Sequence, residues 1–400
     1  MQGPLSMLKL SAEAFFMIKG FVDSNILVAD SGIKKTSLNV AAGKIAEIGQ
    51  GEGIHVPPNL IVVPGFIDEH IHGSDGADAM DAKASSLDTI RKAITQDGVT
   101  SFCPTTMTMD KNHILSALKV IHNAIKADER DGARILGAHL EGPFISPTFK
   151  GAQKEEDIRP CDVSLMKEFV QACPEIREVT FAYEQNGAEL LKFLLEKGIA
   201  PSIGHSDCPP ALLKEGVGKG IRCVTHTYNA QRRFTHRDVG VVGVALIDDR
   251  LRCELICDLI HVCPDAVKLL YKCKGQDKLI LITDSMEGKH LKDGHYSLGG
   301  QDVLVKDGAA RLADGTLAGS VLTLNKAIKN AKDTLGISLA QAVELASKNP
   351  AENLGLGKTM GSIKKGYLAD FAVVDESLNV YLTIRDGEIV YQKAAYPWIF

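Results

Sequence analysis

The feature that most constrains the fold of this chain is the alternation of short apolar runs with amphipathic stretches along its central part. Each apolar run has the length of a β-strand, and helix-like segments such as Lys111–Ala127 and Gly187–Glu196 lie between most of them. Repeated β-α units predict a parallel sheet, and eight of them predict a (β/α)8 TIM barrel. The eight predicted strands are Phe66–His72, Val99–Pro104, Ile135–Glu141, Glu178–Glu184, Ala200–Ser206, Cys223–Asn229, Arg252–Asp258 and Lys278–Asp284.

The two ends of the chain have a different pattern, with short strands and tight turns. Near the start, Ala42-Gly43-Lys44 separates two apolar segments, and near the end Asp386-Gly387 does the same. Neither end has enough strands for a core of its own. We therefore predict one small β-sandwich domain built from residues 1–63 and 356–400, beside a barrel at residues 64–355.

Residues that commonly bind metals lie at the ends of the predicted barrel strands. Alternate side chains of a strand point the same way, so His70 and His72 should face a common point. Active sites of (β/α)8 barrels lie at the carboxyl ends of the strands. A mixture of imidazoles and carboxylates suits zinc or iron. The candidate metal ligands are His70, His72, Glu141, His205, His226 and Asp284.

These ligands predict a metal-dependent hydrolase with one or two ions per subunit. Glu141, His205 and His226 could hold one ion and leave a position open for water. The H-x-H pair and Asp284 could complete a second site, with Glu141 as the bridge. A bound divalent ion lowers the pKa of water to about 7 and polarises a carbonyl group. Asp284 could then take the proton of the water and pass it to a leaving nitrogen, as amide hydrolysis requires.

Two loops near the predicted strand ends are further candidates. Asn229 and the backbone N–H of Ala230 could donate to a phosphate group, and Arg237 could add a charge-assisted contact. A solvated loop explains these three residues equally well. A long segment after Asp284 contains a predicted hairpin over residues 296–312, which we expect at the mouth of the barrel as a possible lid.

The combined motifs resemble a known family. Pro64–Asp68 followed by His70-Ile71-His72 is similar to the amidohydrolase superfamily, and the whole set resembles its N-acetylglucosamine-6-phosphate deacetylase family. The further motifs are His139–Pro143, Gly204–Ser206, Thr225-His226 with Asn229-Ala230, Thr283-Asp284 and Gly315–Ser320.

The resemblance implies the substrate and the roles of particular residues. The acetamide of N-acetylglucosamine-6-phosphate would be hydrolysed, with Glu141, His205 and His226 on the main metal and Asp284 as general base, then acid. The family also implies a homodimer in which the arginine reaches the neighbouring subunit's site. The implied phosphate and sugar contacts are Asn229, Ala230, Arg237 and His261.

Three positions depart from the family pattern. Gln153 stands where some members have a sugar-contacting histidine, and we keep it as a candidate substrate contact. Gln231 replaces a common methionine, and Leu259 replaces a common glycine. These departures leave the preference between the glucosamine and galactosamine epimers open.

Composition excludes several other classes of protein. The net charge of −5 and the absence of a basic run disfavour nucleic-acid binding. No apolar segment approaches the ~18 residues that span a bilayer. Nine dispersed cysteines without a C-x-x-C motif predict a reduced, cytoplasmic compartment.

Three rival functions remain. They are a galactosamine-epimer deacetylase, an amidohydrolase that acts on a cyclic amide or a nucleobase, and an inactive barrel that serves as a binding protein. Many cyclic amidases bridge two metals with a carboxylated lysine on the fourth strand, and Val179–Tyr183 contains no lysine. The bridging carboxylate must then come from elsewhere, and Glu141 is the candidate. All expected ligands are present, which disfavours the inactive barrel.

Overall fold

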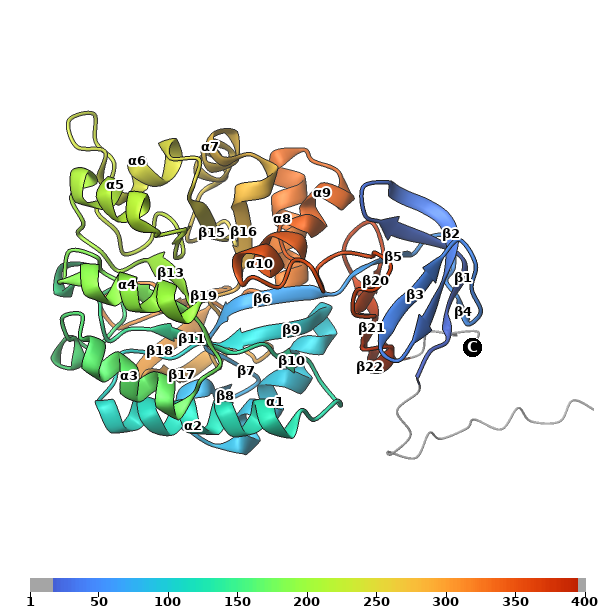
Figure 1. The fold of residues 1–400 in the computed structure, drawn as a ribbon, viewed down its shortest axis with the longest axis horizontal. Coiled ribbons are helices and arrows are strands. Elements are labelled where there is room, and N and C mark those ends of the chain that lie inside the picture. Colours follow the sequence, from blue (N-terminus) through green and yellow to red (C-terminus); the bar gives the residue numbers. More distant parts are fainter. Residues whose placement is uncertain (1–16, 395–400) are drawn as a thin grey trace, which may run out of the picture.

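The computed structural model describes residues 17–394, so the predicted β-domain segments at residues 1–16 and 395–400 lie outside the described residues. Strands from both ends of the described chain form a single sheet at one side of the molecule (Figure 1). Its strand order is β22-β21-β20-β5-β1-β2-β3, and β4 pairs with β1. The strands are β1 (Gly20–Val28), β2 (Gly32–Ala41), β3 (Lys44–Ile48), β4 (Ile54–His55), β5 (Ile61–Pro64), β20 (Phe371–Val374), β21 (Val380–Arg385) and β22 (Glu388–Gln392).

The two chain ends meet where β5 and β20 pair antiparallel, with Val63 opposite Ala372. Residues on one face of this sheet, such as Phe21 of β1, Leu38 of β2 and Phe371 of β20, form an apolar cluster of their own. Neither end could bury such a face alone, which is why the strands combine. The structure therefore shows a shared sheet, and the two-layered sandwich stays a prediction.

The central part of the chain contains two parallel sheets, of order β10-β9-β6 and β11-β12-β13-β14-β15-β16. Isolated parallel bridges between Thr105 and His139 and between Ile71 and Ser285 link the edges of the two sheets. The strands are β6 (Phe66–Ile71), β9 (Val99–Pro104), β10 (Arg134–Ile135), β11 (Ala138–Glu141), β12 (Ile176–Phe181), β13 (Ala200–Ile203), β14 (Cys223–Val224), β15 (Arg252–Ile256) and β16 (Leu279–Ile282).

Helices surround the parallel strands (Figure 1), and most of them present an apolar face to the strands and a polar face to water, whereas α6 consists of apolar residues and glycine and is mostly buried. Asp110 caps α2 and Asp162 caps α3, each through two backbone N–H groups. The helices are α1 (Ala84–Ala93), α2 (Lys111–Ala127), α3 (Val163–Ala172), α4 (Gly187–Lys197), α5 (Pro210–Lys219), α6 (Gly240–Ile247), α7 (Pro264–Lys274), α8 (Leu324–Leu335), α9 (Leu339–Glu344) and α10 (Lys348–Asn353). Short 3-10 turns lie at Ala79–Asp81, Ile94–Asp97, Pro147–Phe149, Glu155–Asp157 and Gln276–Lys278.

The predicted excursion after the last parallel strand is a small antiparallel sheet. It contains β17 (Gly294–Leu298), β18 (Gln301–Lys306) and β19 (Ala309–Arg311), in that order. Asp307 and Gly308 both have positive φ, as a tight hairpin turn between β18 and β19 requires. A separate two-stranded ribbon, β7 (Gly73–Ser74) and β8 (Ala77–Asp78), follows β6.

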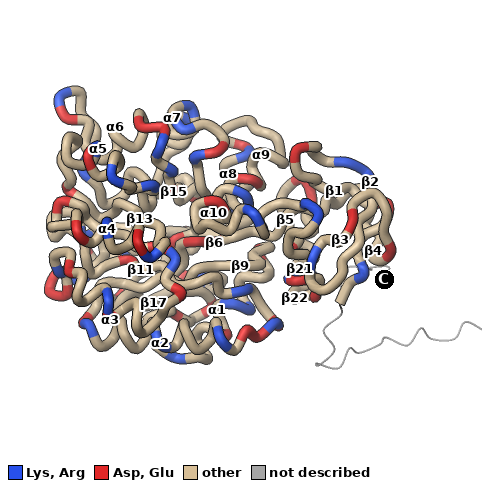
Figure 2. The backbone as a smooth tube through the Cα atoms, in the orientation of Figure 1, with Lys and Arg blue, Asp and Glu red and all other residues tan. Residues whose placement is uncertain are grey.

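Charged residues of both signs lie along the helices and loops (Figure 2), in keeping with the small net charge. Within residues 17–394, no helix is both long enough and apolar enough to cross a bilayer. The nine cysteines form no disulfide bond.

Candidate functional site

The candidate metal ligands lie at, or just beyond, the carboxyl ends of parallel strands. Glu141 is the last residue of β11, and His72 directly follows β6. His205, His226 and Asp284 each lie two residues beyond a strand, and their φ angles are 47°, 31° and 48°. Non-glycine residues rarely adopt such angles, and when they do they cluster at functional sites. The backbone therefore turns out of the sheet at the residues that carry the imidazoles and the carboxylate.

One group of ligand atoms belongs to Glu141, His205 and His226. The Oε1 atom of Glu141 lies 3.0 Å from Nε2 of His226 and 3.3 Å from Nε2 of His205. The two Nε2 atoms are 3.1 Å apart. All three side chains are buried. Two imidazoles and one carboxylate that converge on one point make the donor set of a three-ligand zinc site.

A second group contains His70, His72 and Asp284. The Oδ1 atom of Asp284 lies 3.1 Å from Nε2 of His72 and 3.6 Å from Nε2 of His70. Glu141 joins the two groups, because its Oε1 is 3.5 Å from Nε2 of His70 and its Oε2 is 3.4 Å from Nε2 of His72. The structure thus brings all six predicted ligands together, with Glu141 between the two groups.

Backbone carbonyl groups orient two of the rings. Nδ1 of His72 is 3.2 Å from the carbonyl oxygen of Thr105, and Nδ1 of His205 is 2.9 Å from that of Phe149. A carbonyl oxygen can only accept, so each Nδ1 carries the proton and each Nε2 is directed to the cluster. Such hydrogen bonds fix the tautomer that a metal ligand needs.

The electrostatics of the cluster favour positive charge at its centre. Burial lowers the pKa of His70, but the carboxylates of Asp284, Glu254 and Glu141 outweigh this effect and raise it to about 9. Burial raises the pKa of Asp284, but His70 and His72 lower it overall to about 2. The pKa of Glu141 lies well below its usual range, because burial is outweighed by His70 and by hydrogen bonds from His205, His226 and His72. A divalent cation would supply the charge that imidazolium groups supply here, with release of protons.

A cavity of about 210 Å³ lies beside the cluster, and its wall includes His72, Glu141, His205 and Asp284. Four of the five predicted substrate contacts line the same cavity, and Arg237 does not. Arg237 is exposed on the loop that follows β14. The four lining candidates are Gln153, Asn229, Ala230 and His261.

Gln153 has a position that the sequence did not reveal. Its Nε2 donates to Oε2 of Glu141 at 2.9 Å, and its Oε1 accepts from the backbone N–H of Thr108 at 2.6 Å. The side chain therefore holds the carboxylate between the two ligand groups, and also borders the cavity.

The other lining candidates are fixed by local contacts. Asn229 donates to the carbonyl oxygens of His226 and Thr227, and Nδ1 of His261 lies 2.6 Å from Oδ2 of Asp258. Seven further residues line the wall, and sequence reasoning gave none of them a role: Gly151 and Ala152 lie beside Gln153, and three others lie within the motif Gly315–Ser320. The seven are Met107, Gly151, Ala152, Leu298, Thr316, Leu317 and Gly319.

Two further buried residues, His139 and Glu254, lie next to the candidate ligand His70. His139 lies with its ring centroid 4.5 Å from that of His70, and its Nε2 is 2.8 Å from Oγ1 of Thr180. Burial and then His70 hold the pKa of His139 well below its usual range, so the ring is neutral. Glu254 contacts His70 as well, and sequence reasoning missed it. The available signal was a carboxylate in the middle of an apolar strand, Arg252–Ile256.

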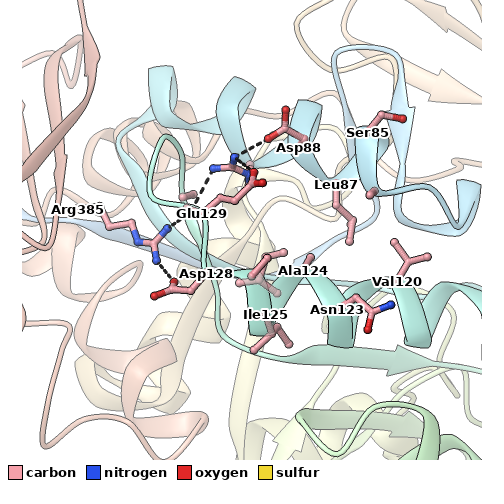
Figure 3. Close-up of a pocket in the computed structure, with 15 residues that line it drawn as sticks. Ser85, Leu87, Asp88, Val120, Asn123, Ala124, Ile125, Asp128, Glu129 and Arg385 are labelled. Carbon is pink, nitrogen blue, oxygen red and sulfur yellow. Dashed lines mark hydrogen bonds and ion pairs between the residues drawn. The ribbon is translucent and has the colours of Figure 1, made fainter. Parts of the chain in front are cut away.

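A larger cavity, of about 450 Å³, lies between α1, α2 and the end of β21 (Figure 3). None of the candidate ligands or substrate contacts lines it. Its buried arginines are already paired, since Arg91 binds Glu129 and Asp88, and Arg385 binds Asp128 (Figure 3). We therefore assign this region to the packing of the terminal sheet against the helices.

Comparison with known proteins gives concordant results. The Amidohydrolase family matches residues 61–390. The N-acetylglucosamine-6-phosphate deacetylase of Bacillus subtilis (strain 168) is 41% identical over 380 residues, which are 92% of this chain and 96% of that protein. The N-acetylgalactosamine-6-phosphate deacetylase of Escherichia coli O157:H7 is 33% identical, over 91% of this chain and 97% of that protein. The crystal structure of N-acetylglucosamine-6-phosphate deacetylase from Thermotoga maritima superposes with a TM-score of 0.86 at 35% identity, over 93% of this chain and 99% of the other.

Proposed function

This chain belongs to the amidohydrolase family, and on that premise we propose that it hydrolyses N-acetylglucosamine-6-phosphate to glucosamine-6-phosphate and acetate. The observation that carries the proposal is the convergence of six candidate metal-ligand side chains, four of which line one cavity. The same chain is 41% identical to the N-acetylglucosamine-6-phosphate deacetylase of Bacillus subtilis, over 96% of the length of that protein.

We propose that the site binds one or two divalent ions per subunit, zinc or iron. Glu141, His205 and His226 would hold the main ion, and His70, His72 and Asp284 the second, with Glu141 as bridge. The residues fit, because imidazole nitrogens and carboxylate oxygens suit these metals, and Nε2 of His70 has no hydrogen-bond partner among the described residues. When bound, such an ion activates water and polarises the acetamide carbonyl group.

We propose that Asp284 moves the proton. Its carboxylate lies on the cavity wall and is ionised, so it can accept a proton from the attacking water. As the new C–O bond forms and the C–N bond breaks, the same carboxyl group would return the proton to the amine nitrogen. Acetic acid and the amine are the products, and transfer of the acid's proton to the amine gives acetate and an ammonium group, which balances the reaction.

For the rest of the substrate we propose contacts from Gln153, Asn229, Ala230 and His261, which border the cavity. Arg237 is exposed and does not line the cavity of its own subunit. Its position supports the proposal of a homodimer in which Arg237 binds the phosphate in the neighbouring subunit's site.

We propose a scaffold that consists of a (β/α)8 barrel over residues 64–355 and a small β-sandwich from residues 1–63 and 356–400. The two bridges that link the parallel sheets support the barrel, and the shared terminal sheet supports the second domain. The unpaired cysteines are compatible with the cytoplasmic location that we propose.

The galactosamine epimer is the second candidate substrate, because a relative named for that activity is 33% identical over 97% of its length. A direct test measures acetate release from both N-acetylhexosamine 6-phosphates, together with bound metal on the same preparation. Faster release from the glucosamine form would support the proposal. Faster release from the galactosamine form would replace the substrate, and stoichiometric metal without release from either would reject both.

A further inference from the structure

Glu254 makes contacts with both groups of candidate metal ligands. It lies within β15, and its side chain is completely buried. Its Oε2 atom lies 3.1 Å from Nδ1 of His70 and 3.0 Å from the backbone nitrogen of His226, which donates to it. These two residues belong to different ligand groups. We propose that Glu254 is a positioning residue that fixes the ligand group of His70 relative to the ligand group of His226. This inference rests on the proposed metal-dependent function.

The contact with His70 determines which ring nitrogen is available to a metal. An ionised carboxylate only accepts hydrogen bonds, so Nδ1 of His70 carries the proton in this contact. The opposite nitrogen, Nε2, is then directed at Glu141 and Asp284, at 3.5 and 3.6 Å. A carboxylate behind a metal-binding histidine fixes the ring orientation and makes the ligand nitrogen more basic. Glu254 has this relation to His70.

The contact with His226 stabilises an unfavourable backbone conformation. The φ angle of His226 is 31°, and such a conformation costs on the order of 1–3 kcal/mol at a non-glycine residue. The charge-assisted hydrogen bond from its N–H to Glu254 offsets part of this cost. The imidazole of His226 is thereby kept 3.0 Å from Oε1 of Glu141.

The surroundings of Glu254 argue against a role in fold stability alone. Carboxylate oxygens of Glu69, Glu178 and Glu254 all lie within 4.8 Å of one another in the buried interior. The second oxygen of Glu254, Oε1, has no hydrogen-bond partner among residues 17–394. A buried carboxyl group beside two others destabilises a fold unless it is paired, and the hydrogen bonds of the Glu254 side chain in the described part of the chain are those with His70 and His226.

The test compares Glu254→Gln and Glu254→Met with Glu178→Gln as the matched control. Glu178→Gln removes a carboxyl group of the same buried cluster that forms no hydrogen bond or ion pair with a candidate ligand within residues 17–394. Its Oε2 accepts from Nδ2 of Asn353 instead. Zinc affinity is measured with chelator-buffered Zn²⁺, and thermal unfolding is measured after metal removal. We expect zinc affinity to fall about 10-fold in Glu254→Gln, because glutamine keeps one oxygen acceptor but not the charge. We expect a fall of about 100-fold in Glu254→Met, because methionine has neither. We expect no change in Glu178→Gln, and metal-free Glu254→Gln should unfold at no lower temperature than the parent.

Parent-like zinc affinity in Glu254→Met would overturn the proposal. If that variant does not fold, the comparison of Glu254→Gln with Glu178→Gln decides, and equal affinities in the two would overturn it. Acetate release by the parent protein is assayed separately. Zinc affinities in the predicted order without acetate release would retain the role of Glu254 and reject the proposed substrate.

Discussion

At the scale of single residues, the site depends on one carboxylate whose two oxygens face different partners. Oε1 of Glu141 lies near His226, His205 and His70, and Oε2 lies near His72 and Gln153. Residue type and position along the strand predicted Glu141 as a ligand. The restraint that Gln153 provides could not be predicted, because Gln153 reaches Glu141 through the fold of the loop between them.

Glu141→Gln should reduce bound metal strongly. The neutral amide loses the charge and one acceptor atom between the two ligand groups, and metal binding needs deprotonated ligands. Metal content per subunit, measured after equilibration with buffered Zn²⁺, checks the expectation. The exposed Glu189→Gln on α4 is the control, and equal metal content in both variants would reject Glu141 as a ligand.

Asp284→Asn should keep the main ion and lose turnover. The amide cannot accept and return a proton, so kcat for acetate release should fall by about 100-fold to 10,000-fold, the usual contribution of general acid–base catalysis. Asp302→Asn, at an exposed position of β18, serves as control. A kcat near that of the parent would remove the proposed proton transfer from Asp284.

At the scale of elements, the predicted strands begin near the observed ones, and six of the eight extend too far at their carboxyl ends, whereas the predictions for β9 and β11 end at the observed residues. Cys223–Asn229 was expected as a strand, and β14 contains only Cys223 and Val224. The chain leaves the sheet because His226 takes a left-handed conformation, which apolar periodicity does not report. Ile135–Glu141 was expected as one strand and is divided into β10 and β11, with Gly137 at φ 154° between them.

Helix starts depend on local signals and are therefore testable by single substitutions. The side chain of Asp110 accepts from the backbone N–H groups of Asn112 and His113 at the start of α2. Asp110→Ala should lower the free energy of unfolding by about 1 kcal/mol in urea denaturation, without loss of bound metal. The exposed Lys119→Ala on the same helix should change it by less, and equal effects would show that the cap is not stabilising.

At the scale of the whole molecule, buried arginines join the terminal sheet to the helical part. Arg385, at the end of β21, is almost fully buried and forms an ion pair with Asp128 (Figure 3). It also donates to the carbonyl oxygens of Glu129 and Gly132, at 2.7 and 3.3 Å. These acceptors all lie in the segment between α2 and β10, so one side chain connects the two parts.

Arg385→Met should lower the free energy of unfolding by about 3 kcal/mol, because it removes a buried donor from the carboxylate of Asp128 and from two backbone carbonyl oxygens. Arg130→Met is the control, since its half-exposed ion pair with Glu388 should contribute about 1 kcal/mol or less. Urea denaturation of both variants, with metal content measured in parallel, provides the comparison. Equal midpoints would show that Arg385 is not needed to join the two parts.

The amino-acid pattern was enough to predict the alternation of strands and helices, the six candidate ligands and their places near strand ends. Those features depend on periodicities of 2 and 3.6 residues and on local turns, which neighbouring residues specify. The tertiary structure was needed to show that Glu254 contacts His70, that Gln153 holds Glu141 and that Arg237 does not line the cavity. His70 and Glu254 are 184 positions apart, and a contact over that separation depends on the path of the whole chain.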